Sequence, residues 1–254
     1  MAPIPVLTPE QAAAWDRSAE QTGISSATLM ESAGRAVVQV MMTRYRDRVR
    51  QGVLVACGAG NNGGDGWVVA RTLHRLGVSV WVAAVPSARP SALCDRMAGL
   101  ARADGVREVA PDGPWPAVGL LVDAILGTGA RGAPHGGAAA LMERLADLAL
   151  PLVAVDGPTG LDLLDGVQHG PLRAALTVTF GGYRRGHLLA RDEVGDTVAA
   201  DIGFPEPDPA WPVLLTDATA RSMVPPLRAA AHKGERGRIV IVGGSPGMTG
   251  AARI

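Results

Sequence analysis

Polar and apolar positions alternate with a helical period over the first fifty residues of the chain. Thr8 is followed by Pro9 and by Gln11, an arrangement that predicts a capped helix start with a capping box, and the helix is expected to run to about Gly23. A second helix is predicted from Ser25 or Ser26. Its apolar side chains recur at helical spacing: Leu29, Ala33, Val37, Val40 and Met41. Two helices are therefore expected before the first strand.

From residue 53 onward the pattern changes to short, continuous apolar runs. These runs cover residues 53–57, 78–85, 120–126, 152–155 and 176–180. Continuous apolar strands are typical of a parallel sheet that is covered on both faces. Helical stretches are predicted between several of them, at residues 67–76, 91–103 and 137–148. The alternation predicts a doubly wound α/β fold, with ligands bound beyond the carboxyl ends of the strands.

The residue composition changes after residue 202. Prolines crowd residues 205–226, which predicts a connector. A further apolar run at 238–242 leads into Gly243 and Gly244 and predicts a new strand and glycine turn. This segment either opens a further domain or adds an edge strand to the first sheet.

Composition narrows the range of partners. The 254 residues carry 24 basic and 24 acidic side chains, so the formal net charge is zero and we expect no binding to nucleic acid or to a membrane surface. Two cysteines and the lack of an 18-residue apolar run predict a soluble, cytoplasmic protein. Lys233 is the only lysine, which excludes lysine chemistry from the main body of the chain.

Three predicted strands end in similar polar sequences. The first leads into Asn61-Asn62-Gly63-Gly64-Asp65, the third contains Asp123 before a glycine-rich loop at 127–132, and the fourth leads into Asp156 and Thr159. Carboxyl ends of parallel strands share one rim, so three carboxylates are expected to meet in one pocket. Such a pocket requires a cation, a proton or many donors, and its oxygen ligands suit a hard cation.

Each of these features also has a purely structural explanation. Gly58, Gly60 and Gly63 fit the spacing G-x-G-x-x-G but alone could form an ordinary tight turn. Asp123 or Asp156 taken singly could cap a helix. An NADP-dependent oxidoreductase is a further alternative. The second strand lacks the usual ribose-binding acid at its end, but Arg89 could hold a 2′-phosphate there.

Taken together, these stretches resemble the NAD(P)H-hydrate epimerase family, also called the YjeF N-terminal domain family. The matching segments occur in family order at residues 29–37, 58–73, 122–132, 153–162, 176–186 and 198–205. The resemblance implies a Rossmann-like three-layer sandwich with a mostly parallel central sheet and two extra N-terminal helices. It also implies an isomerase that interconverts the R and S epimers of hydrated NADH and NADPH.

The resemblance implies a set of site residues as well. The substrate would be bound by Asn61, Asn62, Gly63, Gly64, Asp65, Gly127, Thr128, Gly129, Ala130, Arg131, Gly132, Ala133 and Asp156. One potassium ion per subunit would be bound by Asn62, Asp123 and Thr159. Asp156 is our first choice for the acid/base group and Asp65 our second. Some relatives carry lysine where Arg131 stands, so Arg131 is better assigned to a phosphate or electrostatic contact.

By the same resemblance, residues 1–222 form the epimerase domain. Residues 223–254 form a linker and the truncated start of an ADP- or ATP-dependent dehydratase domain of the ribokinase type. Dehydratase (lyase) activity is then expected only in a longer, bifunctional protein. A non-catalytic nucleotide- or RNA-associated scaffold of the same fold is an alternative function. A homodimer through the leading helices also stays open.

Overall fold

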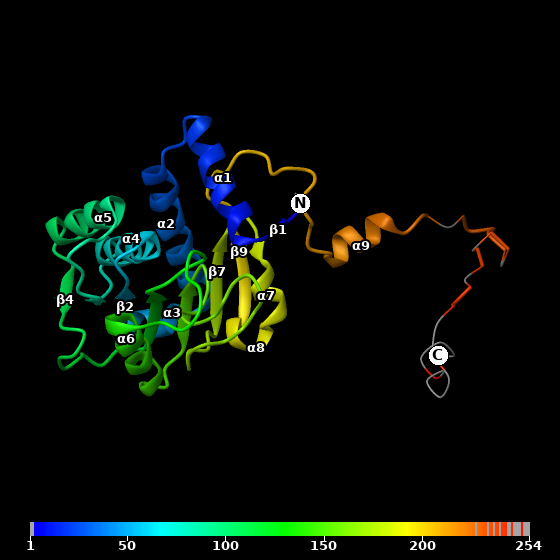
Figure 1. The fold of residues 1–254 in the computed structure, drawn as a ribbon. Coiled ribbons are helices and arrows are strands. Elements are labelled where there is room, and N and C mark those ends of the chain that lie inside the picture. Colours follow the sequence, from blue (N-terminus) through cyan, green and yellow to red (C-terminus); the bar gives the residue numbers. More distant parts are fainter. Residues whose placement is uncertain are drawn as a thin grey trace. The chain divides into compact units, whose positions relative to one another are not determined.

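The computed structural model describes residues 3–226 and, beyond them, 228–232, 234–235, 237–238, 240–242, 245 and 250. The chain divides into two compact units, Met1–Leu214 and Leu215–Ile254. The first unit contains the predicted sheet and its helices (Figure 1). No helix in the described ranges is both long and apolar enough to cross a membrane.

A seven-stranded sheet forms the centre of the first unit, and every pairing within it is parallel. In spatial order its strands are β4 (Arg107–Val109), β3 (Val80–Ala84), β2 (Val53–Cys57), β5 (Leu120–Ala124), β6 (Leu152–Val155), β7 (Leu176–Phe180) and β9 (Asp196–Ala200). The four strands β2, β5, β6 and β7 are fully buried along their length. The predicted α/β fold with a parallel sheet is confirmed. The edge strands β4 and β9 were not predicted, because both are partly polar and only partly buried, and β4 has only three residues.

Helices cover both faces of this sheet and complete three layers. They are α1 (Pro9–Gln21), α2 (Ser26–Arg44), α3 (Arg46–Arg50), α4 (Asn61–Arg75), α5 (Ala92–Ala103), α6 (Gly136–Asp147), α7 (Arg185–Leu189) and α8 (Arg191–Val194). Alternate side chains of each strand point to opposite faces. In β2, Val53 and Val55 join a core shared with α2, α4 and α5, whereas Leu54 joins a core shared with α6.

The two predicted N-terminal helices are both present. The main-chain N–H of Gln11 donates to the Thr8 hydroxyl over 3.3 Å, and the main-chain N–H of Thr8 donates to the Gln11 side chain over 2.8 Å, which confirms the capping box. Ser25 caps α2 in a similar way. Ahead of α1, β1 (Val6–Leu7) pairs with β8 (Tyr183–Arg184) in a separate two-stranded sheet. This pairing brings the N-terminal segment next to Arg184.

The order of the strands reverses beside β2. The chain passes from β2 outward to β3 and β4, and then returns to β5 on the opposite side of β2. The carboxyl ends of β2 and β5 therefore flank a switch point, where doubly wound folds bind their ligands. Helix α4 begins here, directly after β2.

The start of α4 corrects one prediction. The stretch Asn61–Asp65 was expected to be a loop before a helix at 67–76, but it forms the first turns of α4, whose N-cap is Gly60. Its glycines allow the helix to pack closely against the strand ends. A Cβ atom at Gly63 would lie 1.9 Å from the carbonyl oxygen of Gly58, and one at Gly66 would lie 2.6 Å from the Cβ atom of Ala124.

The second unit contains α9 (Asp217–Met223), which has no buried residue. The strand predicted at 238–242 falls partly on Ile239, which lies outside the described residues. Arg238 and the run 240–242 are not in a strand. Gly243 and Gly244, where the glycine turn was predicted, also lie outside the described residues.

Candidate functional site

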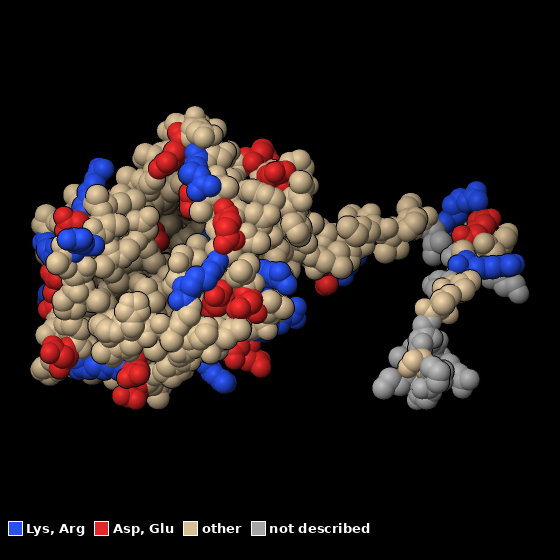
Figure 2. Space-filling view, viewed as in Figure 1, with Lys and Arg blue, Asp and Glu red and all other residues tan. Residues whose placement is uncertain are grey.

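A cavity of about 540 Å³ opens at the switch point of the sheet. Helices α1, α2, α4 and α5 contribute to it, as do the loop after β5, Asp156 after β6, and the segment that follows β9. Its lining residues are Asp16, Ser26, Leu29, Met30, Ala33, Gly60, Asn61, Asn62, Asp65, Leu93, Ile125, Leu126, Gly127, Thr128, Gly129, Ala130, Asp156, Phe180, Arg184, Ile202 and Phe204. Figure 2 shows a hollow in this unit, with acidic and basic side chains around its mouth.

The N-terminus of α4 forms one wall of the cavity. Gly60 caps the helix without a side-chain hydrogen bond, and Gly60, Asn61 and Asn62 all line the cavity. The first N–H groups of a helix lack partners within the helix and carry a partial positive charge, so they bind anions such as phosphate. The Asn61 side chain is held in place by the Ser91 hydroxyl, which donates to Asn61 Oδ1 over 2.8 Å.

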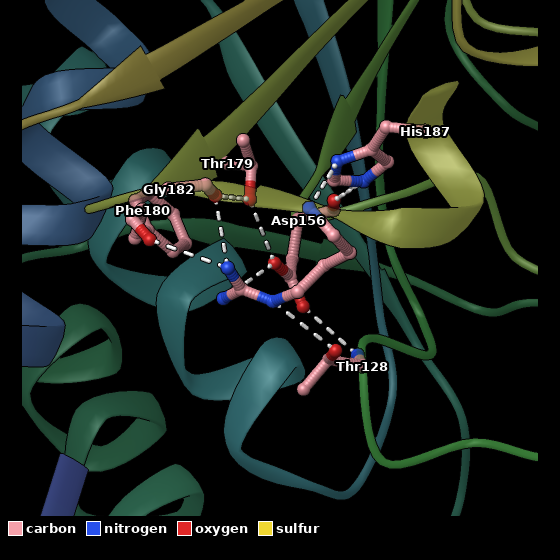
Figure 3. Close-up of polar contacts among 7 residues, drawn as sticks. Thr128, Asp156, Thr179, Phe180, Gly182 and His187 are labelled. Atoms are coloured by element: carbon pink, nitrogen blue, oxygen red, sulfur yellow. Dashed lines mark hydrogen bonds and ion pairs between the residues drawn. The ribbon is translucent and has the colours of Figure 1, made fainter. Parts of the chain in front are cut away.

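The side-chain carboxyl of Asp156 is fixed in place by three groups that surround its oxygen atoms. Its Oδ2 accepts from the Thr128 main-chain N–H over 2.8 Å, and its Oδ1 accepts from the Thr179 hydroxyl over 3.2 Å and faces the Arg184 guanidinium over 3.3 Å (Figure 3). Asp156 is only 7% exposed. Two hydrogen-bond donors and one guanidinium thus hold this carboxyl in place.

The backbone at Asp156 is also held in an unusual conformation. Its φ of 66° lies in the left-handed region, which is uncommon for a residue with a side chain. The buried His187 ring fixes it. His187 Nδ1 accepts from the Arg184 main-chain N–H over 3.0 Å, so Nε2 carries the proton and donates to the Asp156 carbonyl over 2.7 Å. Desolvation lowers the pKa of His187 to about 4, which keeps the ring neutral.

Asp65 lines the same cavity but has very different surroundings. Its partly buried carboxyl makes no hydrogen bond or ion pair with the residues that the structure describes. Desolvation, together with the like charges of Asp156 and Asp16, raises the pKa of Asp65 well above its ordinary value. This shift favours the protonated form of Asp65, whereas the neighbouring Asp156 carboxyl has three donors around it.

A third carboxyl, that of Asp16 on α1, also lines the cavity. Desolvation raises the pKa of Asp16, the nearby Arg184 opposes the shift, and Asp156 adds to it. This residue was not predicted, because the sequence around it shows only a capped helix.

Asp123 and Thr159 lie just beneath the cavity wall. The Asp123 carboxylate is fully buried, and it accepts from the Thr159 hydroxyl over 2.8 Å and from the Thr159 main-chain N–H over 2.7 Å. Thr159 Oγ1 in turn accepts from the main-chain N–H of Leu126, which lines the cavity, over 3.0 Å. Desolvation raises the pKa of Asp123 to about 6. A buried acid that is satisfied only by neutral donors has a chemical reason to attract a cation.

The third predicted potassium ligand, Asn62, has an unsatisfied atom. Its Nδ2 is buried and has no hydrogen-bond partner among the described residues. Asn62 packs against Gly127, where an added Cβ atom would lie 3.0 Å from Asn62 Oδ1. No cluster of three or more His, Cys, Asp or Glu side chains suited to a metal occurs in the described ranges. Amide, carboxylate and hydroxyl oxygens nevertheless fit a hard monovalent cation by their chemistry, and the potassium site stays a prediction.

The structure brings most of the predicted substrate residues to the cavity. Those that line it are Asn61, Asn62, Asp65, Gly127, Thr128, Gly129, Ala130 and Asp156. Those that do not are Gly63, Gly64, Arg131, Gly132 and Ala133. Gly63 and Gly64 serve the packing of α4 instead, because a Cβ atom at Gly64 would lie 2.6 Å from the Met30 sulfur.

Arg131 in particular faces away from an anion site. Its guanidinium pairs with Glu10 over 3.0 Å and with Asp162 over 3.3 Å. It therefore ties the loop after β5 to α1. Arg89 does not line the cavity either, so the predicted 2′-phosphate contact finds no support in its position.

Several lining residues were missed from the sequence although a signal was present. Met30, Ala33, Phe180, Arg184, Ile202 and Phe204 all lie in segments that resemble the family. No role was assigned to them because they are mostly apolar or lie far from the glycine-rich motifs. They form the apolar wall of the cavity and the ion pair to Asp156.

Comparison with known proteins places this geometry in a family. Residues 26–186 match the family described as YjeF-related protein N-terminus. The bifunctional NAD(P)H-hydrate repair enzyme Nnr of Pyrobaculum aerophilum is 37% identical and the Nnr enzyme of Escherichia coli is 36% identical, each over 93% of this chain. These matches cover 48% and 47% of the two enzymes, so the chain spans about half the length of the curated relatives it matches.

A solved structure has the same fold. The crystal structure of the yeast protein YNL200c superposes with a TM-score of 0.68 and 25% identity, over 82% of this chain and 98% of the yeast chain. The fold, the segment matched and the identity to the repair enzymes agree. The chain belongs to the family of YjeF-related protein N-termini.

Proposed function

We propose that this chain epimerises hydrated NADH and NADPH, interconverting the R and S forms at the ring carbon that bears the hydroxyl. The observation that carries the proposal is the cavity in which a helix N-terminus, Asp65 with its raised pKa and an anchored Asp156 carboxyl come together. The relatives named as NAD(P)H-hydrate repair enzymes supply the substrate class.

One part of the cavity wall suits the pyrophosphate of such a substrate, and another suits its hydrated nicotinamide ring. The N-terminus of α4 at Gly60–Asn62 offers main-chain N–H groups to the pyrophosphate. Asp65 lies one helical turn further along α4 and faces the cavity with Asp156. The hydrated nicotinamide ring is then placed between these two carboxyl groups.

The chemistry follows from the different states of the two acids. The Asp65 carboxyl donates a proton to the ring hydroxyl, the C–O bond breaks, and its electron pair leaves with the oxygen as water. The ring nitrogen supplies electron density to the carbon, and the cation that forms is stabilised by the Asp156 carboxylate. Water then adds to the other face and loses a proton to a carboxylate. No electrons are gained or lost, so the reaction needs no redox partner.

We also propose that potassium binds next to the site. Asn62, Asp123 and Thr159 would hold it, and its charge would offset that of the buried Asp123 carboxylate. The buried Asp123 carboxyl supports this assignment, because among the described residues only neutral groups donate to it.

The decisive experiment supplies the purified chain with one pure epimer. Conversion to the other epimer should be faster than in buffer alone, and Asp65→Asn should slow it by about 10²–10⁴-fold, the range typical of a lost general acid. An exposed control, Asp147→Asn on α6, should keep the wild-type rate. A wild-type rate equal to the spontaneous one would exclude the epimerase function.

A further inference from the structure

We propose that Asp16, on the N-terminal helix α1, is a second proton-transfer residue of this site and acts on the face of the substrate ring opposite to Asp65. The inference rests on the proposed epimerase function and assigns the residue that completes it. Asp65 alone can assist departure of the hydroxyl from one face only.

Asp16 and Asp65 share a cavity but reach it from different helices. Asp65 projects from α4 and Asp16 from α1, and α2 packs against both of these helices. Neither carboxyl makes a hydrogen bond or ion pair within the described part of the chain, so both are free to exchange a proton with a ligand. Asp156, the remaining acid, is already occupied by three donors.

The position of Asp16 is fixed by its neighbour Trp15. The Trp15 ring stacks on Phe204 with 4.5 Å between ring centroids, and it meets Trp211 edge-on at 5.4 Å. Trp15 Nε1 also donates to the Pro205 carbonyl over 3.0 Å. Because Phe204 itself lines the cavity, this anchoring holds α1 at the cavity mouth. Asp16 therefore stands on a rigid support, as a proton-transfer group must.

The charges around the two acids allow one proton to be shared between them. Asp16 faces Arg184, Asp156, Glu20 and Arg17. Asp65 faces Asp156 and Asp16, together with the uncharged thiols of Cys57 and Cys94. The charges of Asp156 and Asp16 raise the pKa of Asp65, whereas the Arg184 guanidinium opposes the rise in the pKa of Asp16, so a single proton is favoured on Asp65 over Asp16.

Inversion at the ring carbon requires proton transfer on both faces of the ring, and Asp65 and Asp16 supply one group for each face. Starting from one epimer, protonated Asp65 donates to the hydroxyl, which leaves as water. A water molecule on the opposite face then attacks the ring cation and gives its proton to ionised Asp16. The other epimer uses the two residues in reverse. Each turnover breaks one C–O bond, forms another, and moves one proton from one aspartate to the other.

Exchange of the hydroxyl oxygen with labelled water distinguishes the two residues. Each pure epimer is incubated in H₂¹⁸O with the full chain, and both epimerisation and ¹⁸O incorporation with retention are measured. Asp16→Asn should lose epimerisation by about 10²–10⁴-fold but still exchange the oxygen of the epimer whose hydroxyl faces Asp65. Asp65→Asn should exchange the oxygen of the opposite epimer. This complementary pattern would not arise from a structural defect.

Two controls keep the test decisive. Asp16→Glu retains a carboxyl and should restore part of the epimerisation, and Asp147→Asn should behave as wild type. Wild-type epimerisation in Asp16→Asn, or exchange of the same epimer in both asparagine variants, would overturn the assignment of Asp16. Failure of the wild-type chain to epimerise at all would instead remove the proposed function on which it rests.

Discussion

Asp65 and Asp156 show how two identical side chains in one cavity acquire different surroundings. Asp156 has three donors around it, including an arginine, whereas Asp65 has none among the described residues and lies near two like charges. Asp156 was our first choice for the acid/base group and Asp65 the second. The surroundings lead us to propose the reverse order, which no residue-by-residue pattern in the sequence could establish.

The interaction between Asp16 and Asp65 predicts a measurable pKa change. Asp16 raises the pKa of Asp65 by charge repulsion, so Asp16→Asn should lower it. Titration of the ¹³C-labelled Asp65 carboxyl by NMR should show its midpoint moving to lower pH. The midpoint in Asp147→Asn, which lies on an exposed part of α6, should not move. An unchanged midpoint in Asp16→Asn would mean that the two carboxyls do not interact.

His187 predicts a dependence of stability on pH. Its pKa falls from an ordinary 6.5 to about 4 on folding, so between these values the unfolded state binds a proton that the folded state does not. Stability from this residue is complete above pH 6.5 and is lost as the pH falls toward 4. Between pH 7 and pH 5 the loss should be on the order of 2 kcal/mol.

The variant His187→Gln isolates this contribution. It should be less stable than wild type at pH 7, and its stability should fall less between pH 7 and pH 5. Urea unfolding at both values provides the measurement. Because the raised pKa values of Asp65 and Asp123 act in the opposite direction, only the difference between the two proteins is diagnostic. Equal slopes for both proteins would contradict the neutral, buried ring.

The potassium proposal also makes a residue-scale prediction. A cation that binds only the folded state raises stability by about 2.7 kcal/mol when its concentration is a hundred times the dissociation constant. The unfolding temperature in potassium chloride should therefore exceed that in sodium chloride. In Asp123→Asn this difference should disappear, whatever the variant's own stability. The same difference in both proteins would place the ion elsewhere.

At the scale of elements, the start of α4 depends on glycine. The sequence predicted a loop over Asn61–Asp65, because Gly58, Gly60 and Gly63 fit the G-x-G-x-x-G spacing of a turn between a strand and a helix. The chain is nevertheless helical there, since only a residue without a side chain fits between α4 and the carbonyl of Gly58. Tertiary packing overrides local propensity at this position.

Replacing two helical glycines by alanine distinguishes the effect of close packing on stability from the effect of helix propensity. Gly63→Ala should destabilise the protein by about 1–3 kcal/mol or more, because its Cβ atom would lie 1.9 Å from the Gly58 carbonyl oxygen. Gly99→Ala on α5 is the matched control. A Cβ atom there meets no atom within 4 Å, so the substitution should stabilise the helix by roughly 0.5–1 kcal/mol. Urea unfolding of both variants tests the contrast, and a neutral Gly63→Ala would contradict the close packing of α4.

Strands differed in how well they could be predicted. The fully buried β2, β6 and β7 were predicted with the bounds that the structure shows, because buried parallel strands are mostly apolar, and the two threonines of β7 also suit a strand. The edge strands β4 and β9 carry charged residues such as Arg107 and Asp196, which interrupt an apolar pattern. Pairing with a neighbouring strand, rather than their own composition, makes them strands.

At the scale of the whole molecule, the site belongs to the first unit alone. All residues that line the cavity precede Leu214, and the described residues after it include none that is buried. A chain ending at Leu214 should therefore keep the unfolding temperature of the full chain within about 2 °C and keep the rate of the proposed epimerisation. Differential scanning calorimetry and the single-epimer assay test this. A large loss of stability would show that the sheet unit needs residues beyond 214.

The sequence by itself determined the class of fold and the rim on which the site lies. Continuous apolar strands predict a parallel sheet, and parallel strands place their carboxyl ends together, so Asp65, Asp123 and Asp156 could be expected near one another. The resemblance of separate segments then indicated the family. These conclusions depend on local pattern and chain order, which a sequence displays directly.

Only the tertiary structure decided which surroundings, and therefore which proposed role, each acidic residue of the cavity has. It placed Asp16 on the cavity lining, buried Asp123 beneath the wall and paired Arg131 with Glu10. It also surrounded Asp156 with donors, whereas no described residue donates to the Asp65 carboxyl. Protonation state depends on desolvation and on charges brought together from distant parts of the chain. Those contacts join residues as far apart as α1 and β8, and no local sequence pattern records them.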